Sequence, residues 1–140
     1  MAAQFYSLEF DGYWREPNKG SIPAESGIYC VFSCVHNVAD KTVALKKLIY
    51  IGESDDVNAR VAYHDRLSDW RKHIKQGEAL CYSFCPVPST NRIRCEAAMI
   101  FKHKPPVNTE YTQAFPFDQT TLSLTGKTTL LYTSYSIQRT

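Results

Sequence analysis

GIYCVF, residues 27–32, and KLIYIG, residues 47–52, are the two stretches of this chain that decide its fold. Both are rich in β-branched and aromatic residues, which favour strands. A polar segment from His36 to Lys46 joins them, and we interpret it as an enlarged hairpin loop. The two stretches therefore predict an antiparallel pair of core strands.

Further strands are predicted on either side of this pair. Residues 4–10 alternate well enough for a strand, and Asp11-Gly12 is typical of a turn that ends it. Residues 79–87 (ALCYSFCPV) alternate in side-chain direction and predict a third core strand. Residues 122–137, with Thr125-Gly126-Lys127 in their middle, predict a terminal hairpin.

Helices are predicted after the second and third core strands. Ser54, Asp55 and Asp56 begin the first, because acidic residues favour the positive end of the helix dipole. Its expected face carries residues at helical spacing: Val57, Arg60, Val61 and His64. Ser68 begins a second helical piece, with Trp70 turned inward and Gly77 at the position after its end.

A third helix is predicted between residues 91 and 104, where an apolar stripe comprises Ile93, Ala97, Ile100 and Phe101. Pro105-Pro106 ends it, because proline has no N–H to donate. The predicted class is α+β: a small, mainly three-stranded antiparallel sheet flanked by helices, with an N-terminal strand and a C-terminal hairpin added. We expect one domain over residues 1–140, with its core at 27–108 and an extension at 111–140.

Composition limits the possible classes of protein. The chain has 140 residues, 44% of them hydrophobic, and a net charge of +2, so any nucleic-acid partner requires a local basic patch. The first residues lack the pattern of a secretion signal, and no apolar run is long enough to span a membrane. We therefore expect a cytoplasmic protein with its five cysteines reduced. Zinc binding by Cys30, Cys34, Cys81 and Cys85 is disfavoured, because strand residues four apart lie about 13 Å from each other.

Glu96 lies at the edge of the apolar stripe of the third predicted helix. A carboxylate on the inner side of a helix is costly unless it is paired, protonated or bound to a metal. One interpretation is an ion pair with a nearby arginine, and the other is a divalent cation such as Mg²⁺. Arg60 and His64 on one helix face, and Tyr29 and Tyr50 on paired strands, likewise have an ordinary interpretation as a solvated face and two core tyrosines.

The order of these residues resembles the GIY-YIG nuclease family. Gly27-Ile28-Tyr29 is followed by Tyr50-Ile51-Gly52, and then come Arg60, His64, Glu96 and, after the proline pair, Asn108. The resemblance covers residues 27–108, although the spacer between the two tyrosines is longer than the family's usual one. The Arg60/His64 pair resembles the restriction-enzyme branch more than the excision-repair branch.

The resemblance implies a metal-dependent endonuclease that hydrolyses a phosphodiester bond, most readily in DNA. Glu96 would hold Mg²⁺ or Mn²⁺, Arg60 would stabilise charge on the phosphate, and Tyr50 would position water or phosphate. Either Tyr29 or His64 would take the proton from the attacking water. The implied nucleic-acid contacts are Lys46, Lys47, Arg92, Arg94 and Asn108.

Several alternatives stay open at this stage. The domain could bind nucleic acid or protein without cleaving anything, or act as a toxin or defence effector. Residues 124–129 resemble the end of a phosphate-binding loop but lack its first glycine and its helix. RNA stays an alternative substrate to DNA, and cutting both strands of a palindromic site would favour a homodimer by symmetry.

Overall fold

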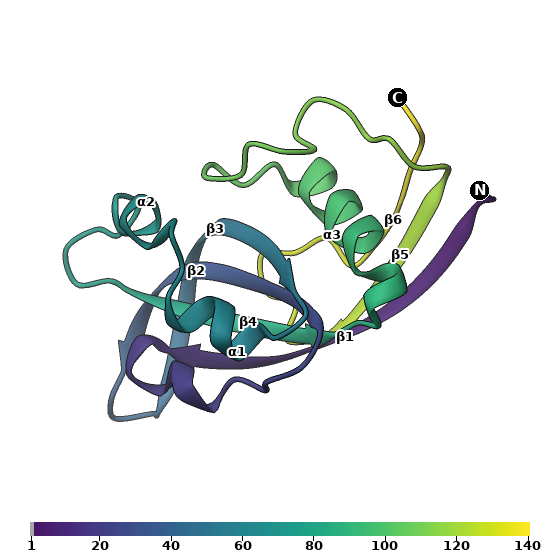
Figure 1. Ribbon diagram of the computed structural model, residues 1–140. Coiled ribbons are helices and arrows are strands. Elements are labelled where there is room, and N and C mark those ends of the chain that lie inside the picture. Colours follow the sequence, from purple (N-terminus) through teal and green to yellow (C-terminus); the bar gives the residue numbers. More distant parts are fainter. Residues whose placement is uncertain (1) are drawn as a thin grey trace.

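The computed structural model describes residues 2–140, in which one six-stranded sheet curls into a half-barrel (Figure 1). Its strands are β1 (Gln4–Arg15), β2 (Gly27–Asn37), β3 (Thr42–Ser54), β4 (Ala79–Pro86), β5 (Thr120–Gly126) and β6 (Ser134–Ile137). Their order across the sheet is β3-β2-β4-β1-β5-β6, so β3 and β6 are the edges. All neighbours are antiparallel except β1 and β5, which are parallel.

The expected small three-stranded sheet is wrong, because the N-terminal strand and the C-terminal hairpin belong to the same sheet as the core strands. The half of β1 from Asp11 to Arg15 pairs with β4, while the half from Gln4 to Phe10 pairs with β5. β1 thereby joins two antiparallel groups into one mixed sheet. The predicted turn at Asp11-Gly12 is wrong for the same reason, since the strand continues there with a bulge.

The antiparallel pair formed by β2 and β3 is confirmed, and so are the third core strand β4 and the terminal hairpin of β5 and β6. The predicted loop from His36 to Lys46 is wrong. Both strands run on into this segment, with His36 paired to Val43 and Asn37 to Thr42, so only four residues, 38–41, connect them. The long spacer therefore lengthens the hairpin and enlarges its strands.

The helices are α1 (Val57–Ala62), α2 (Leu67–Arg71) and α3 (Ser89–His103), and a 3₁₀ helix, η1, covers Glu16–Ser21. Asp56 begins α1 by accepting a hydrogen bond from the Ala59 N–H at 3.0 Å, as the acidic start predicts. α3 ends before Pro105 as predicted, with Lys104 in the left-handed conformation. Two predictions are wrong: α1 ends before His64, and α2 ends well before Gly77.

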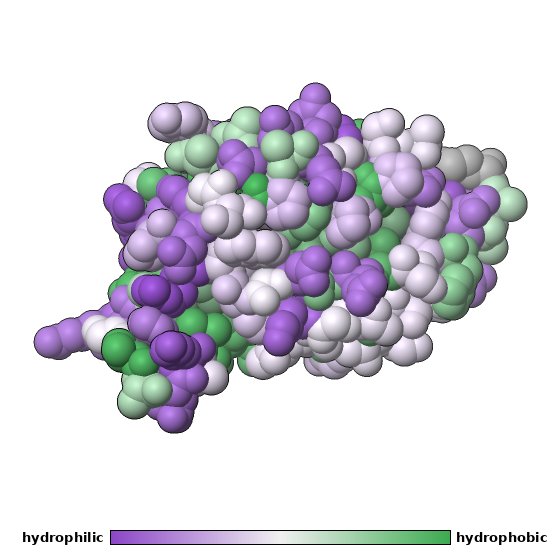
Figure 2. Space-filling view, turned by 90° about the horizontal axis from the view of Figure 1, so that it is seen from below, coloured by the Kyte–Doolittle hydropathy of each residue, from purple (hydrophilic) through white to green (hydrophobic). Residues whose placement is uncertain are grey.

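The two faces of the sheet carry separate hydrophobic cores. One core holds Ile28, Cys30, Phe32 and Ile51 against α3, which contacts strands from both halves of the curled sheet. The other holds Tyr29, Val31 and Ile49 with Val57 of α1 and Trp70 of α2. Alternation along β2 thus places Tyr29 on the face opposite Ile28 and Cys30. Figure 2 shows the molecule from below, where hydrophobic side chains appear in groups between hydrophilic ones.

Two glycines allow the strands to approach each other where the tyrosines lie. A Cβ atom on Gly27 would come within 2.2 Å of the Cys85 carbonyl oxygen, and one on Gly52 within 2.3 Å of the Tyr29 hydroxyl oxygen. Both distances are far below a van der Waals contact. Gly27 therefore leaves the space that β4 needs to pair with β2, and Gly52 leaves the space that the Tyr29 phenol occupies.

Candidate active site

Tyr29 and His64 form the centre of the candidate site. Tyr29 extends from β2 beneath the segment that follows α1, and its hydroxyl oxygen lies 2.7 Å from Nε2 of His64. Both residues are buried. The sequence predicts that His64 shares a helix face with Arg60, but His64 lies in the turn after α1, and this turn directs the imidazole toward the sheet.

The backbone around His64 determines which imidazole nitrogen carries the proton. The Arg66 N–H donates to Nδ1 of His64 at 3.0 Å, and a backbone N–H can only donate. The Asp65 carboxylate is also 3.5 Å from Nδ1, but it forms a closer ion pair with Arg60 at 2.8 Å. In the neutral ring the proton therefore lies on Nε2, which donates to the Tyr29 hydroxyl oxygen. The Tyr29 O–H is left free to donate elsewhere.

Aromatic rings fix the orientation of His64. Its ring centroid lies 4.3 Å from that of Trp70 and 5.4 Å from that of Tyr50. Tyr50 in turn lies 6.2 Å from Tyr29, so the two motif tyrosines are neighbours on one face of the sheet. Trp70 was predicted only as an inward-facing helix residue. Its contact with His64 depends on the turn between α1 and α2, which no local pattern reveals.

Burial and Arg60 control the protonation of the pair. Burial lowers the pKa of His64 to about 4, and the nearby Arg60 guanidinium acts in the same direction, so His64 is neutral at pH 7. Burial also raises the pKa of Tyr29 well above its usual range, with a further rise from Tyr50, while Arg60 opposes both. Tyr29 therefore keeps its proton in the free protein, and added positive charge favours its loss.

Glu96 approaches the same site from α3, on the other face of the sheet. It reaches Tyr50 because β3 is an edge strand, and both residues line a small pocket of about 60 Å³ with Arg66, Asn108 and Glu110. Burial raises the pKa of Glu96 to about 8, and the charges of Glu53 and Glu110 contribute. Within residues 2–140 Glu96 forms no ion pair, so the alternative interpretation, in which an arginine pairs with Glu96, does not apply.

The surroundings of Glu96 fit a site in which one carboxylate holds a divalent cation. Added positive charge stabilises the ionised form of a carboxylate whose pKa is raised by burial and by neighbouring acids, and Mg²⁺ accepts one carboxylate with its other positions filled by water and phosphate. The described residues contain no cluster of three or more His, Cys, Asp or Glu that could hold a metal by themselves. The donor set therefore suits a cation shared with a substrate phosphate.

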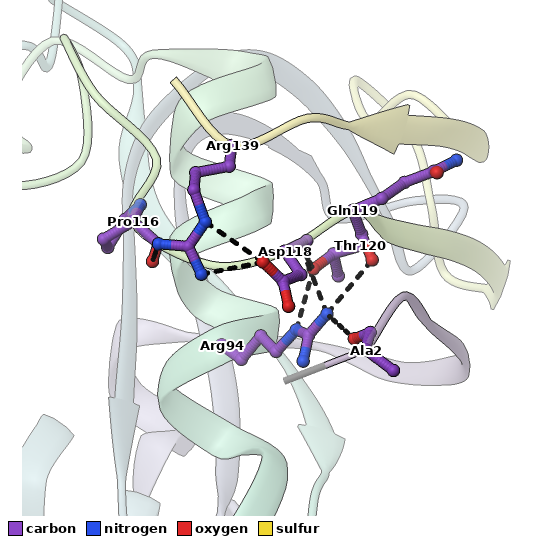
Figure 3. A network of polar contacts seen from close by, with 7 residues as sticks. All are labelled: Ala2, Arg94, Pro116, Asp118, Gln119, Thr120 and Arg139. Carbon is purple, nitrogen blue, oxygen red and sulfur yellow. Dashed lines mark hydrogen bonds and ion pairs between the residues drawn. The ribbon is translucent and has the colours of Figure 1, made fainter.

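Two of the predicted nucleic-acid contacts have structural roles. Arg94 is buried and donates to the Thr120 hydroxyl at 2.8 Å and to the carbonyls of Ala2, Asp118 and Gln119 at 3.0 Å each (Figure 3). It holds α3 to the start of β5, so this inward-turned guanidinium has a structural role, and its implied contact with nucleic acid stays a prediction.

Asn108 likewise holds the backbone together. Its amide donates to the Ile51 carbonyl at 2.8 Å and accepts from the Ile51 N–H at 2.9 Å. This pairing continues the β3 ladder onto the segment after Pro106 and places Thr109 and Glu110 at the pocket. Asn108 therefore bonds to backbone beside the pocket, and its implied contact with nucleic acid stays a prediction.

The other predicted contacts lie closer to solvent. Arg92 is bound to Glu53 and donates to the Ser26 hydroxyl at 2.8 Å, so it neutralises one of the acids beside Glu96. Lys46 and Lys47 lie on edge strand β3 and line a pocket of about 270 Å³ with Lys104 and Tyr132. Lys47 is also 2.8 Å from Nδ1 of His73. A basic approach therefore lies along the strand that carries Tyr50.

The cysteines are free thiols in the interior, in keeping with the expected reduced state: Cys30, Cys34, Cys81, Cys85 and Cys95. Burial raises the pKa of Cys30 and Cys85 to about 12, which makes these thiols inert.

No family model, curated protein or solved structure matches this chain. Among the helices of residues 2–140, none combines the length and hydrophobicity needed to cross a bilayer.

Proposed function

We propose that this chain is a metal-dependent endonuclease of the GIY-YIG type, which hydrolyses phosphodiester bonds in DNA. The observation that supports the proposal best is the buried Tyr29–His64 hydrogen bond beside Tyr50, on the edge strand where Tyr50 also lines one pocket with Glu96. Two core tyrosines would need neither a buried imidazole nor a half-buried carboxylate with a raised pKa beside them.

Tyr29 is the residue that we assign as general base. His64 donates from Nε2 to the Tyr29 oxygen and cannot accept a proton there in this tautomer, while its Nδ1 is occupied by the Arg66 N–H. The imidazole instead stabilises the phenolate that forms when Tyr29 loses its proton. Since burial raises the pKa of Tyr29, the phenolate requires the positive charge of Arg60 and of the loaded site.

Arg60 and Tyr50 act on the phosphate in this proposal. The Arg60 guanidinium is partly exposed and is oriented by its ion pair with Asp65, so it can face a phosphate at the mouth of the site. Such a preorganised cation stabilises the charge that develops during attack on phosphorus. Tyr50 lies between the Tyr29–His64 pair and Glu96, where its hydroxyl can position a water molecule or a phosphate oxygen.

Glu96 is the residue that would hold Mg²⁺ or Mn²⁺. The cation supplies Lewis-acid stabilisation of negative charge on the phosphate oxygens when it is bound. The negative charges of Glu53 and Glu110 raise the affinity of the Glu96 site for cations, and Arg92 limits this effect by pairing with Glu53.

Cleavage of supercoiled plasmid DNA tests the proposal. Wild type is expected to nick or linearise the plasmid with Mg²⁺ or Mn²⁺ and to be inactive with EDTA. Glu96→Gln should lower the rate at least about a hundredfold, because the metal ligand is worth several kcal/mol in the transition state. Glu9→Gln, on the exposed side of β1, is the matched control and should cleave like wild type.

Cleavage that survives Glu96→Gln would refute the mechanism. Absence of cleavage by folded wild type on plasmid, branched DNA and RNA would refute the enzymatic assignment and favour a binding domain without catalysis.

A further inference from the structure

A large hollow of the described chain lies away from the candidate active site. It has a volume of about 690 Å³ and lies where the end of β1, the 3₁₀ helix η1 and the turn between β2 and β3 meet Lys127 at the end of β5. Tyr13 forms part of its wall and packs edge-on against Phe32 at 5.8 Å. None of the residues assigned to catalysis lines it, so its features require a separate explanation.

The hollow is basic. Its wall carries Arg15, Lys41, Lys127 and His36, together with the polar side chains of Asn18 and Thr42, and no acidic residue. Within residues 2–140 neither Arg15 nor the two lysines forms an ion pair. Three cations, Arg15, Lys41 and Lys127, are thus brought to one concave surface without an ion-pair partner among residues 2–140.

Some acidic residues near this surface in the chain are engaged by other groups, such as Glu16, which pairs with Lys19. Asp40 precedes Lys41, but its carboxylate accepts a hydrogen bond from the Asn37 amide at 3.0 Å. Glu78 accepts from the Lys75 N–H at 3.0 Å. Gathering like charges without partners is unfavourable for the folded protein, so the arrangement points to an anionic ligand that supplies the missing charge.

We infer that this basic hollow, defined by Arg15, His36, Lys41 and Lys127, binds backbone phosphates of a nucleic acid whose scissile bond lies at Tyr50. The inference rests on the proposed function, since it assigns the hollow to the same substrate. Edge strand β3 connects the two places: it begins beside Lys41, passes Lys46 and Lys47, and then reaches Tyr50.

The length of β3 sets the separation. Tyr50 follows Lys41 by nine residue steps, and at about 3.3 Å per step they span at most about 30 Å, less where the strand curves. B-form DNA completes one turn in about 34 Å, so the hollow reaches phosphates up to about nine base pairs from the cleaved bond. A small anion would have no need of the basic stretch in between, which a polyanion would contact throughout.

The test measures binding in an inactive background, so that it does not depend on cleavage. Glu96→Gln protein is titrated in EDTA with a fluorescein-labelled 40-base-pair duplex over a series of salt concentrations. The hollow variant adds Arg15→Gln, Lys41→Gln and Lys127→Gln. The matched control adds Lys72→Gln, Lys75→Gln and Lys102→Gln, three exposed lysines outside the hollow, and circular dichroism verifies that all proteins are folded.

Each phosphate contact that is lost lowers the slope of log K against log salt by about 0.9. The hollow variant should therefore bind with a slope smaller by about two to three, and the control should keep the slope of its parent. Equal slopes for the two triple variants would overturn the inference. So would a loss of binding to anionic phosphatidylserine vesicles by the hollow variant without any loss of binding to duplex, because the partner would then be a membrane.

The outcome is separable from that of the proposed function. Wild type that binds through the hollow but cleaves nothing keeps this inference and refutes the nuclease. Active wild type whose binding slope is unchanged by the hollow substitutions keeps the nuclease and refutes this inference.

Discussion

The hydroxyl oxygen of Tyr29 lies 2.7 Å from Nε2 of His64, 35 residues further along the chain. This hydrogen bond joins strand β2 to the turn that follows α1. Because the Arg66 N–H occupies the other imidazole nitrogen, the bond runs from His64 to Tyr29. In the proposed mechanism the chemistry of the site depends on the Tyr29 phenol, whose hydroxyl oxygen accepts a hydrogen bond from His64.

Removing that hydroxyl is expected to abolish most of the activity. Tyr29→Phe keeps the ring in the core and should lower single-turnover cleavage of plasmid by about 10²–10⁴-fold, the usual contribution of a general base. Tyr82→Phe is the matched control. It removes a buried hydroxyl on neighbouring β4 that is bound to Glu16, and it should cleave like wild type. Wild-type cleavage by Tyr29→Phe would transfer the role of base to another group.

Adding one methyl group beside the phenol tests the steric role of the YIG glycine. Gly52→Ala places a Cβ atom 2.3 Å from both Cζ and the hydroxyl oxygen of Tyr29, so the ring has to move. We expect the free energy of unfolding, measured with urea, to fall by about 1–3 kcal/mol, and cleavage to be lost with the displaced hydroxyl.

The control for this change is Gly20→Ala, where a Cβ atom meets no neighbour within 4 Å. It should leave both the stability and the cleavage rate close to those of wild type. A Gly52→Ala protein as stable and active as the control would show that Tyr29 needs no such space.

The raised pKa of Glu96 predicts how metal affinity depends on pH. The carboxyl has a pKa of about 8 because of burial and of the charges of Glu53 and Glu110, and it must ionise to bind a cation. The Mg²⁺ concentration needed for half-maximal cleavage should therefore fall as pH rises from 6 toward 8, by about tenfold per pH unit. An affinity independent of pH over this range would contradict the assignment of Glu96 as ligand.

The same raised pKa predicts that the stability of the metal-free protein falls as pH rises, whereas its metal affinity increases. The pKa of Glu96 is raised from 4.5, so the stability it contributes is present below pH 4.5 and is lost as pH rises through about 8. Glu96→Gln removes this dependence. In EDTA at pH 9 the free energy of unfolding of this variant, measured with urea, should exceed that of wild type by up to a few kcal/mol. At pH 4 the two proteins should be about equally stable. A Glu96→Gln protein less stable than wild type at pH 9 would show that the carboxylate has a stabilising partner.

Arg94 is expected to matter for folding and not for binding. Arg94→Leu leaves the carbonyls of Ala2, Asp118 and Gln119 without their donor, and it should lower the free energy of unfolding by about 2–4 kcal/mol. Arg139→Leu, which removes a more exposed arginine of the same network, should cost about 1 kcal/mol or less (Figure 3). Affinity for duplex DNA per folded molecule should be unchanged in both, and a selective loss in Arg94→Leu would restore it as a nucleic-acid contact.

Local patterns in the sequence determined the elements of the site. The hairpin of β2 and β3, the third strand β4, the acidic start of α1 and the end of α3 before Pro105 follow from propensity and from the chemistry of caps and prolines. The order of Tyr29, Tyr50, Arg60, His64 and Glu96 identified the candidate residues before any coordinates, because each belongs to a recognisable local segment.

Only the tertiary structure decided how these segments meet. β1 pairs with β5 across more than a hundred residues, and that pairing turns the expected three-stranded sheet into six strands, since no local pattern encodes the register of distant strands. The turn after α1 places His64 beside Tyr29 and Tyr50, and the edge position of β3 lets Tyr50 line a pocket with Glu96, while the Arg94 side chain is buried. The sequence specifies the type of each side chain, but the direction of that side chain and its pKa depend on the groups that pack around it.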